Sequence, residues 1–164
     1  MMSHVADIEK ILTQEKVLTV SNFTEADAFN VGTSIRTIIE NEGVSGLIEI
    51  RLWDRQLFLC AMKGTSTDNV DWVRRKVNVV QRFQTSSYRK ALEMKEAGIG
   101  FDVARGVNPL DYAAAGGGFP IRIKDGPIIG VITVSGLPQR DDHRVVVQAL
   151  SAHLSVPYAD IALD

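Results

Sequence analysis

The spacing of apolar residues along the chain predicts four amphipathic helices. The first follows Ser3, and the second extends over residues 24–42, ahead of the stop signal Gly43. The third begins near Ser66, whose hydroxyl can cap a first turn, and the last begins at Pro138 and extends to about residue 154. The apolar positions that define them are, in order, Ile8, Ile11 and Leu12; Ala28, Val31, Ile35, Ile38 and Ile39; Val70, Val73, Val77 and Val80; and Val145, Val146, Ala149 and Leu150.

Two stretches of alternating apolar and polar residues predict β-hairpins. The first occupies residues 47–62 with a turn at 54–55, and the second occupies residues 119–134 with a turn at 125–126. Antiparallel hairpins separated by helices predict an α+β fold, in which α-helices cover an antiparallel β-sheet. We expect a single domain over residues 1–164.

The connection between the third helix and the second hairpin carries turn and loop signals. Residues 97–109 lack periodicity and contain three glycines and a proline, which predicts an exposed loop. A brief helical turn through Tyr112 is expected next, and Gly116-Gly117-Gly118 ends it.

The composition is that of an ordinary globular chain. A length of 164 residues suits one domain, and 45% hydrophobic against 23% charged residues argues against disorder. The formal net charge of −2 provides no global field for nucleic acid or an anionic membrane, so we expect neither as a partner. No signal-peptide pattern or membrane-length apolar run occurs, so we expect a cytoplasmic protein. The single cysteine, Cys60, excludes an internal disulfide and is expected to pack in the core.

A polar ridge on the third helix is the first candidate for chemistry. Arg75, Asn78, Arg82 and Ser86 recur at steps of three and four residues and so share one face. Guanidinium groups suit carboxylate or phosphate, and Trp72, one turn earlier, offers a surface on which a planar ligand could stack. The alternative is an ordinary solvated helix face. If the ridge is functional, Arg75 and Arg82 should face the Gly116–Gly118 turn or a neighbouring subunit.

The second candidate combines the glycine turn with a histidine. Gly116 and Gly117 could bring backbone amides close to an anion, although a tight backbone crossing is the more common use of paired glycines. His143 lies in the first turn of the last helix, where it could serve as a ligand or base; the alternative is a hydrogen-bonded packing residue. The sequence has no phosphate-loop, dinucleotide, zinc-protease or nucleophile-elbow motif, and three histidines are too few to indicate a metal site.

Taken together, these segments resemble an uncharacterised family grouped with HbpS/GlcG-like, haem-degrading-type domains. The resemblance extends over about residues 25–150. It depends on Asp68-Asn69, Trp72, Arg74-Arg75-Lys76, Arg82-Phe83, Ser86-Ser87-Tyr88, Tyr112-Ala113, Gly116-Gly117, Phe119-Pro120, Ser135-Gly136-Leu137-Pro138-Gln139 and Asp142-His143.

The resemblance implies an antiparallel sheet covered by helices, a homo-oligomer, and a group in which some relatives bind haem or act in sensing. It also implies a histidine before the paired glycines, where this chain has Ala115. Stable haem binding requires an axial ligand, and the other candidates are His143, His4, His153, Tyr88, Tyr112, Met62 and Cys60. Of these, His143 is the best situated, so we expect weak or no stoichiometric haem binding, with any residual binding dependent on His143.

Three functional hypotheses follow. The first is a domain that binds or senses a small planar or anionic ligand through Trp72, Arg75, Arg82, Ser86, Gly116, Gly117 and His143. The second is an oligomeric interaction or adaptor protein, in which the same Arg and Trp side chains anchor a subunit contact. The third, for which spacing identifies no nucleophile and base, is an enzyme acting on a small organic acid with His143 as proton carrier.

Overall fold

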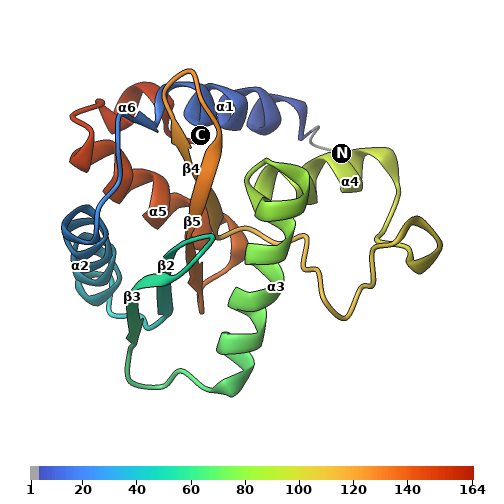
Figure 1. Cartoon of the computed structure of the whole chain (residues 1–164), viewed down its shortest axis with the longest axis horizontal. Helices are drawn as coiled ribbons and strands as arrows, with labels where there is room; N and C mark the ends of the chain where they lie inside the picture. The colour runs from blue at the N-terminus through green and yellow to red at the C-terminus, as the bar shows by residue number, and fades with distance from the viewer. Residues whose placement is uncertain (1–3) are drawn as a thin grey trace.

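The computed structural model describes residues 4–164 and arranges them around a five-stranded sheet (Figure 1). The predicted start of the first helix at Ser3 lies outside the described residues. The strands are β1 (Thr19–Val20), β2 (Leu47–Leu52), β3 (Gln56–Ala61), β4 (Gly118–Ile123) and β5 (Ile128–Ser135). The helices are α1 (Val5–Val17), α2 (Glu25–Asn41), α3 (Thr67–Phe83), α4 (Ser87–Ala97), the 3-10 helix η1 (Val103–Arg105), α5 (Gln139–His153) and α6 (Tyr158–Ile161).

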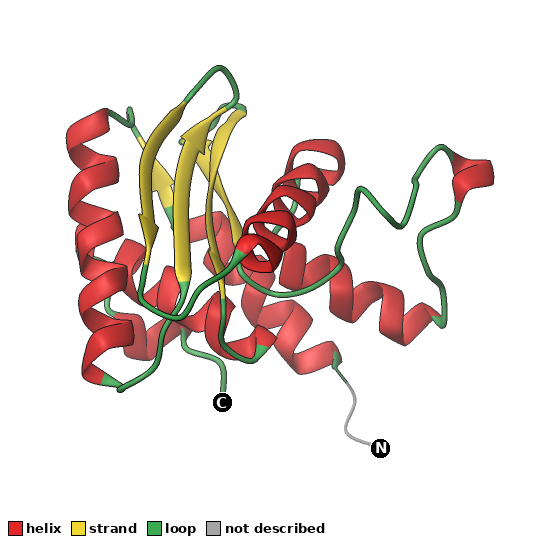
Figure 2. Ribbon diagram, turned by 90° about the horizontal axis from the view of Figure 1, so that it is seen from below, coloured by secondary structure: helices red, strands yellow, loops and turns green. Residues whose placement is uncertain are grey.

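Helices lie on both sides of the sheet, whose strands follow the order β1-β4-β5-β2-β3 (Figure 2). Both predicted hairpins are present, β2 with β3 and β4 with β5, and β5 also pairs antiparallel with β2. These pairings confirm the predicted α+β class with an antiparallel core. The short strand β1 was not predicted. It pairs parallel with β4 and so makes the sheet mixed. Two residues are too few to show an alternating pattern.

Local capping explains where the long helices begin. The Thr24 backbone amide donates to Oδ2 of Asp27 at 2.7 Å, and the Asp27 amide donates back to the Thr24 hydroxyl at 3.3 Å. This reciprocal capping box satisfies amides that the first turn leaves without helical partners. The Ser66 amide similarly donates to Oδ1 of Asn69 at 2.9 Å, so α3 begins where the sequence predicted.

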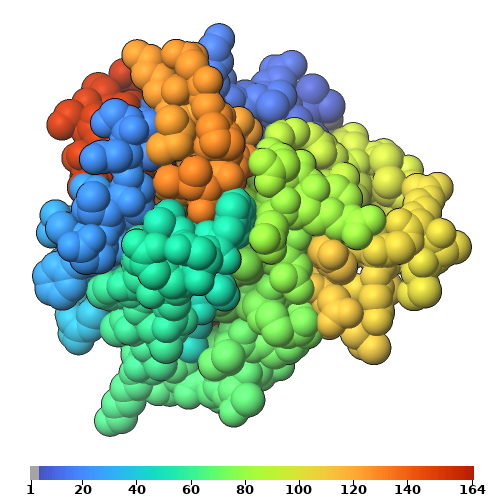
Figure 3. All heavy atoms as spheres, viewed as in Figure 1, coloured from blue at the N-terminus to red at the C-terminus, as the bar shows by residue number. Residues whose placement is uncertain are grey.

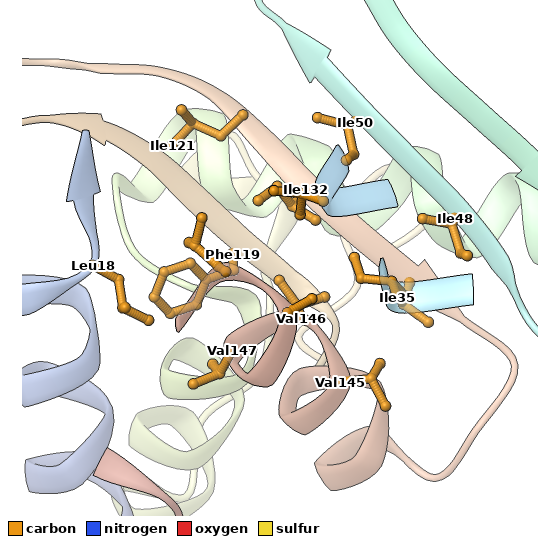
Figure 4. Close-up of a cluster of buried hydrophobic side chains, with 14 of the residues drawn as sticks. Leu18, Ile35, Ile48, Ile50, Phe119, Ile121, Ile132, Val145, Val146 and Val147 are labelled. Atoms are coloured by element: carbon orange, nitrogen blue, oxygen red, sulfur yellow. The ribbon is translucent and has the colours of Figure 1, made fainter. Parts of the chain in front are cut away.

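The larger hydrophobic core lies between the sheet and the pair α2 and α5 (Figure 4). Ile48 and Ile50 are fully buried on one face of β2, as the alternation predicted. Phe119 of β4 is also fully buried and lies between Leu18 and Val147 of α5. Burying a side chain of this size contributes about 1.5–3 kcal/mol, so this layer supplies most of the stabilisation that holds α5 against the sheet.

A smaller core forms where α3 packs on the opposite face. Val73, Val77 and Val80 contact Leu47 and Val131 of the sheet, which confirms most of the predicted valine stripe. Val70, the first residue of that stripe, is 54% exposed, so the packing of α3 on the sheet begins one turn later than expected.

The long connection between α4 and β4, residues 98–117, projects from the body of the fold beside α3 (Figures 2 and 3). Phe101 and Tyr112 pack on Phe83, with ring centroids 5.8 Å and 6.2 Å from that of Phe83. The helical turn expected through Tyr112 is reduced to one hydrogen-bonded turn before it, in which the Asp111 amide donates to the Asn108 carbonyl oxygen at 2.9 Å. A 3-10 helix forms earlier because Asp102 caps it, accepting from the amide of Ala104 at 2.9 Å.

β3 forms one edge of the sheet, which alters the interpretation of its apolar residues. Leu59 is 53% exposed, and Cys60 is half-buried instead of enclosed, because an edge strand has a neighbour on one side only. The run from Ile128 to Val134 lies in the central strand β5 and is mostly buried. Of the two apolar runs, 57–62 and 128–134, the one in β3 is therefore the one that exposes apolar surface.

Candidate functional site

A buried ion pair joins α3 to α5 at one end of the sheet. Nζ of Lys76 lies 2.9 Å from Oδ2 of Asp142, and each side chain is only 3% exposed. Nζ also donates to the carbonyl oxygen of Val134 at 2.9 Å, while Oδ1 of Asp142 accepts from the amide of Leu137 at 2.9 Å. Backbone groups at the end of β5 therefore fix both members of the pair.

Burial acts against both charges of this pair. Removal from water lowers the pKa of Lys76 and raises the pKa of Asp142, although each charge partly offsets the effect on the other. The lysine is therefore closer to losing its proton at neutral pH than an exposed lysine would be. Buried ion pairs contribute little net stability relative to apolar packing, and perturbed titratable pairs cluster at functional sites.

The pair lies against an open cleft of about 270 Å³. The cleft is formed by the first turns of α3, the end of β5 and the start of α5. Its lining is Asp68, Asn69, Trp72, Lys76, Ala115, Ser135, Gly136, Leu137, Gln139 and Asp142. A second cleft, of about 480 Å³, shares Asn69, Gly136 and Leu137 with it, so the two are neighbours at the same end of the molecule.

The paired glycines allow the backbone to pass directly over the ion pair. A Cβ atom on Gly116 would lie 2.0 Å from the carbonyl oxygen of Gln139, and one on Gly117 would lie 2.2 Å from that of Val134 and 2.9 Å from Nζ of Lys76. Gly117 also has a φ of +127°, which side chains rarely tolerate. The tight-crossing alternative therefore describes these glycines: they close one side of the Lys76 site and do not cradle an anion.

The polar ridge of α3 holds the long connection against the helix. The side-chain amide of Asn78 donates to the carbonyl oxygen of Asp111 at 2.8 Å, and the Arg75 carbonyl accepts from the amide of Ala113 at 3.2 Å. Arg74, outside the predicted ridge, donates to the Asp111 carboxylate and to the carbonyl oxygen of Leu110, each at 3.0 Å. These contacts give the ridge an anchoring role.

The two arginines of the ridge are engaged with neighbouring side chains. Nε of Arg75 lies 2.8 Å from Oδ2 of Asp71, and its guanidinium lies 4.2 Å from the ring centroid of Trp72. Arg82 is exposed and lies 5.8 Å from the ring centroid of Tyr112. The expectation that both guanidinium groups face the Gly116–Gly118 turn is corrected, because they lie against the aromatic and acidic side chains around α3. The alternative, that they face a neighbouring subunit, stays a prediction.

Ser86 does not continue the ridge, because α3 ends before it. Gln84 adopts the left-handed conformation with a φ of 56°, which ends α3, and the chain restarts as α4. Ser86 is fully buried, and its hydroxyl caps α4 by accepting from the amide of Arg89 at 3.3 Å. The spacing that placed it beside Arg82 assumed one continuous helix.

His143 is fully buried, away from solvent, between Tyr88 and Phe119, whose ring centroids lie 5.2 Å and 5.8 Å from its own. Its Nε2 lies 2.8 Å from Oε1 of Gln14, whose amide nitrogen donates to the Ile161 carbonyl at 2.7 Å. This arrangement assigns the proton to Nε2. Burial lowers the pKa of His143 to about 3, so the ring is neutral at physiological pH. The packing alternative therefore describes His143 better than a role as proton carrier.

From the predicted set, Trp72 lines the cleft together with Lys76 and Asp142. Gly117 packs against Lys76 and Gly116 against Gln139, without lining the cleft themselves. Sequence reasoning missed Lys76, although a signal was present. Lys76 occupies the helical step between Val73 and Val80 and so lies within the apolar stripe of α3. A lysine inside such a stripe predicts a buried carboxylate partner, because an unpaired buried charge is strongly destabilising.

No group of three or more His, Cys, Asp or Glu side chains within residues 4–164 could hold a metal ion. Over the same residues, no helix has the length and apolar character needed to cross a membrane.

The chain that forms this fold and this site matches a known protein family. The family model described as "Haem degrading protein HbpS-like" matches residues 23–151, and the chain belongs to this family. UPF0303 protein mlr5144 of Mesorhizobium japonicum is 46% identical over 162 residues, covering 99% of this chain and 97% of that protein.

Solved structures agree with this assignment. The structure of the Ybr137w protein has a TM-score of 0.82 and 28% identity, covering 90% of this chain and 89% of the other. A PduOC:Heme complex has a TM-score of 0.67 at 15% identity, covering 82% and 96% of the two chains, and this likeness shows the shared fold alone.

The residues around the cleft do not fit haem. Its lining includes no histidine, cysteine, methionine or tyrosine, and Ala115 stands before the paired glycines. The side chain of Lys76, a rarer type of ligand, is bound to Asp142. Outside the cleft, the ring of His143 is enclosed, and Nε2 of His153 lies 3.1 Å from Oδ1 of Asp27. The side chains that line the cleft therefore offer haem no suitable axial ligand.

Proposed function

We propose that this protein binds a small polar molecule in the cleft between α3 and α5, with Lys76 and Asp142 as its central contacts. The observation that carries this proposal is a lysine–carboxylate pair, almost completely buried and yet part of a cleft wall. A purely structural contact at this position could be made by apolar side chains at less cost in desolvation. A ligand that accepts a hydrogen bond from the ammonium group would account for a charged pair at this position despite its desolvation cost.

The lining groups favour an oxygen-bearing molecule. Lys76 and the amides of Asn69 and Gln139 can donate hydrogen bonds to a carbonyl or carboxylate oxygen, and Trp72 supplies a flat apolar surface. Asp68 and Asp142 offset the charge of Lys76, so the cleft has no excess of positive charge. A small carbonyl compound or a monocarboxylate suits this cleft better than a multiply charged anion. A multiply charged anion would require the guanidinium groups of Arg75 and Arg82, which do not line the cleft.

Self-association is a second property that a specific observation supports. Leu59 of the edge strand β3 is 53% exposed, and Phe29 of α2 is 61% exposed, while the ring centroid of Phe29 lies 6.4 Å from that of Phe58 in β3. Exposed large apolar side chains along an unpaired strand edge are typical of subunit contacts. We therefore keep the homo-oligomer as a proposal alongside ligand binding, and the adaptor role as the alternative function.

Native mass spectrometry of the freshly purified protein tests the binding proposal. We expect a small molecule to remain bound to the wild type and to the control variant Arg55→Met. This substitution removes an exposed ion pair between Arg55 and Asp54, which lie outside the cleft lining. Lys76→Met should lose it. A bound molecule retained equally by Lys76→Met would contradict the proposed site. If the purified protein carries nothing, thermal unfolding with added pyruvate replaces this readout, and the same three proteins give the same contrast.

A further inference from the structure

One of the three N–H donors of the Lys76 ammonium group is not used within the described structure. An ammonium group has three donors, and the structure uses two, to Oδ2 of Asp142 and to the Val134 carbonyl oxygen. The third has no hydrogen-bond partner among residues 4–164. Lys76 and Asp142 both line the cleft, so the amine and a carboxyl group 2.9 Å from it belong to the same part of its wall.

We propose that Lys76 captures a small carbonyl compound, an aldehyde or a 2-oxo acid, as a reversible imine, with Asp142 as its proton donor and acceptor. This inference rests on the proposed function and names the ligand class for the same cleft. Burial of a lysine favours a nucleophilic amine over an ammonium, and the adjacent carboxyl group is a base that can take up the proton.

The chemistry balances within the ion pair. Transfer of one proton from Nζ to Asp142 leaves a neutral amine and a carboxylic acid. The amine attacks the carbonyl carbon, a C–N bond forms, and one amine proton moves to the former carbonyl oxygen to give a carbinolamine. Asp142 then returns its proton to the hydroxyl group, which leaves as water. The products are an iminium on Lys76, the Asp142 carboxylate beside it, and one water molecule.

The surroundings of the pair support this assignment over an exposed lysine. The Leu137 amide fixes one carboxyl oxygen of Asp142, which leaves the other directed at Nζ. Gly117 allows the chain to pass close to Nζ, where a side chain would fill the space. The iminium retains one N–H, which the Asp142 carboxylate can accept, so the charge of the product is paired as the charge of the free lysine is.

The opposing interpretation is that Lys76 only anchors α3 to β5 and α5. Both interpretations predict that removing Lys76 destabilises the fold, so stability alone does not separate them. They differ in reactivity, because an anchoring ammonium that stays protonated does not add to a carbonyl. The readout must therefore be a covalent adduct located on the chain.

Reductive trapping of the full-length protein provides that readout. The wild type is incubated at neutral pH with pyruvate, or separately with propionaldehyde, in the presence of sodium cyanoborohydride, which reduces the iminium to a stable secondary amine. Intact-mass and peptide mass spectrometry locate the adduct. We expect one adduct per chain at Lys76 with at least one probe, and the probe that reacts distinguishes an aldehyde from a 2-oxo acid.

Three variants accompany the wild type. Lys76→Arg keeps the charge but lacks a primary amine and should lose the adduct, while the exposed Lys124→Arg should retain it. Asp142→Asn should slow trapping by about 10²-fold or more, since general acid–base assistance is removed. If Lys76→Arg fails to fold, peptide mapping of the wild type still decides the question.

Adducts spread over exposed lysines with Lys76 unmodified would overturn the imine. Thermal unfolding with the same probes and no reductant separates this failure from failure of the proposed function. Stabilisation of the wild type by a probe, lost in Lys76→Arg and without any adduct at Lys76, would overturn the imine and leave the binding cleft in place. The absence of both stabilisation and adduct with either probe would count against the imine and against the cleft.

Discussion

Lys76 and Asp142 are 66 residues apart in the sequence, yet their side chains meet at 2.9 Å in a site with almost no exposure to solvent. The contact ties the middle of α3 to the first turn of α5 across the end of β5. The two helices cover opposite faces of the sheet, so the pair connects the two cores of the molecule.

The pair should show strong energetic coupling. Lys76→Met leaves the Asp142 carboxyl group buried without its cation and is expected to lower the free energy of unfolding by about 3–5 kcal/mol. Asp142→Asn should also destabilise the protein, but the double variant should be much less destabilised than the sum of the two, because no uncompensated charge remains. Urea denaturation of the four proteins measures the coupling. Additive effects would show that the two groups act independently.

His143 predicts an acid-dependent loss of stability. Its pKa is about 3 in the folded protein, against about 6.5 for an ordinary histidine, so the unfolded chain binds the extra proton first as the pH falls. The free energy of unfolding should therefore fall as the pH drops through about 6.5 toward 3, by as much as about 1.4 kcal/mol per pH unit from this group.

The matched variant is His143→Gln, which can still donate to Oε1 of Gln14 but does not titrate. Urea denaturation of both proteins between about pH 7 and pH 5 should give a steeper decline for the wild type. Equal declines in the two proteins would mean that His143 is protonated in the fold, contrary to its enclosure by Tyr88 and Phe119.

Much of the fold could be predicted from the sequence because local patterns determine it. The capping residues Thr24 and Ser66 fixed the starts of two helices, and the alternation around Ile48 and Ile50 fixed the buried face of β2. The parallel strand β1 could not be predicted, since its two residues carry no periodicity and its pairing depends on distant β4. The break after Phe83 was missed because Gln84 is not a residue that usually signals a left-handed turn.

The site was only partly predictable, because its central contact is non-local. Trp72 and the paired glycines were identified by residue type. The contact of Arg75 with Asp71 could have been identified from its i,i+4 spacing, whereas the approach of Arg82 to the distant Tyr112 depends on the tertiary fold. Lys76 could have been identified from its place in the apolar stripe. Its partner could not, since four aspartates, Asp68, Asp71, Asp141 and Asp142, lie in or near the first turns of α3 and α5 and the tertiary fold selects Asp142.

Haemin titration tests the conclusion that the cleft does not fit haem. We expect no sharp, saturable Soret band at one haem per chain, because the cleft lining offers no side chain of the usual axial-ligand types and His143 is enclosed. His143→Ala serves as the comparison. A saturable band that persists in this variant would contradict both the geometric argument and the expectation that any residual binding depends on His143.

Self-association should depend on the edge strand β3. Light scattering at micromolar concentration is expected to give a mass above that of one chain, and Leu59→Lys should reduce it, because a charge on the exposed face of an edge strand opposes pairing. Leu110→Lys, at a 76% exposed position on the long connection, is the control and should have no such effect if β3 is the contact. A monomer mass for the wild type would contradict the proposal.

Fluorine NMR of protein labelled with fluorotryptophan tests the central claim, that the cleft beside Lys76 and Asp142 is the binding site. The chain has two tryptophans, Trp72 at the cleft and Trp53 on the sheet, where its indole nitrogen donates to Ile128 at 2.9 Å. Pyruvate should shift the Trp72 resonance saturably and leave the Trp53 resonance in place, and Lys76→Met should abolish the shift. A saturable shift of Trp53 alone, or a Trp72 shift unaffected by Lys76→Met, would contradict the account.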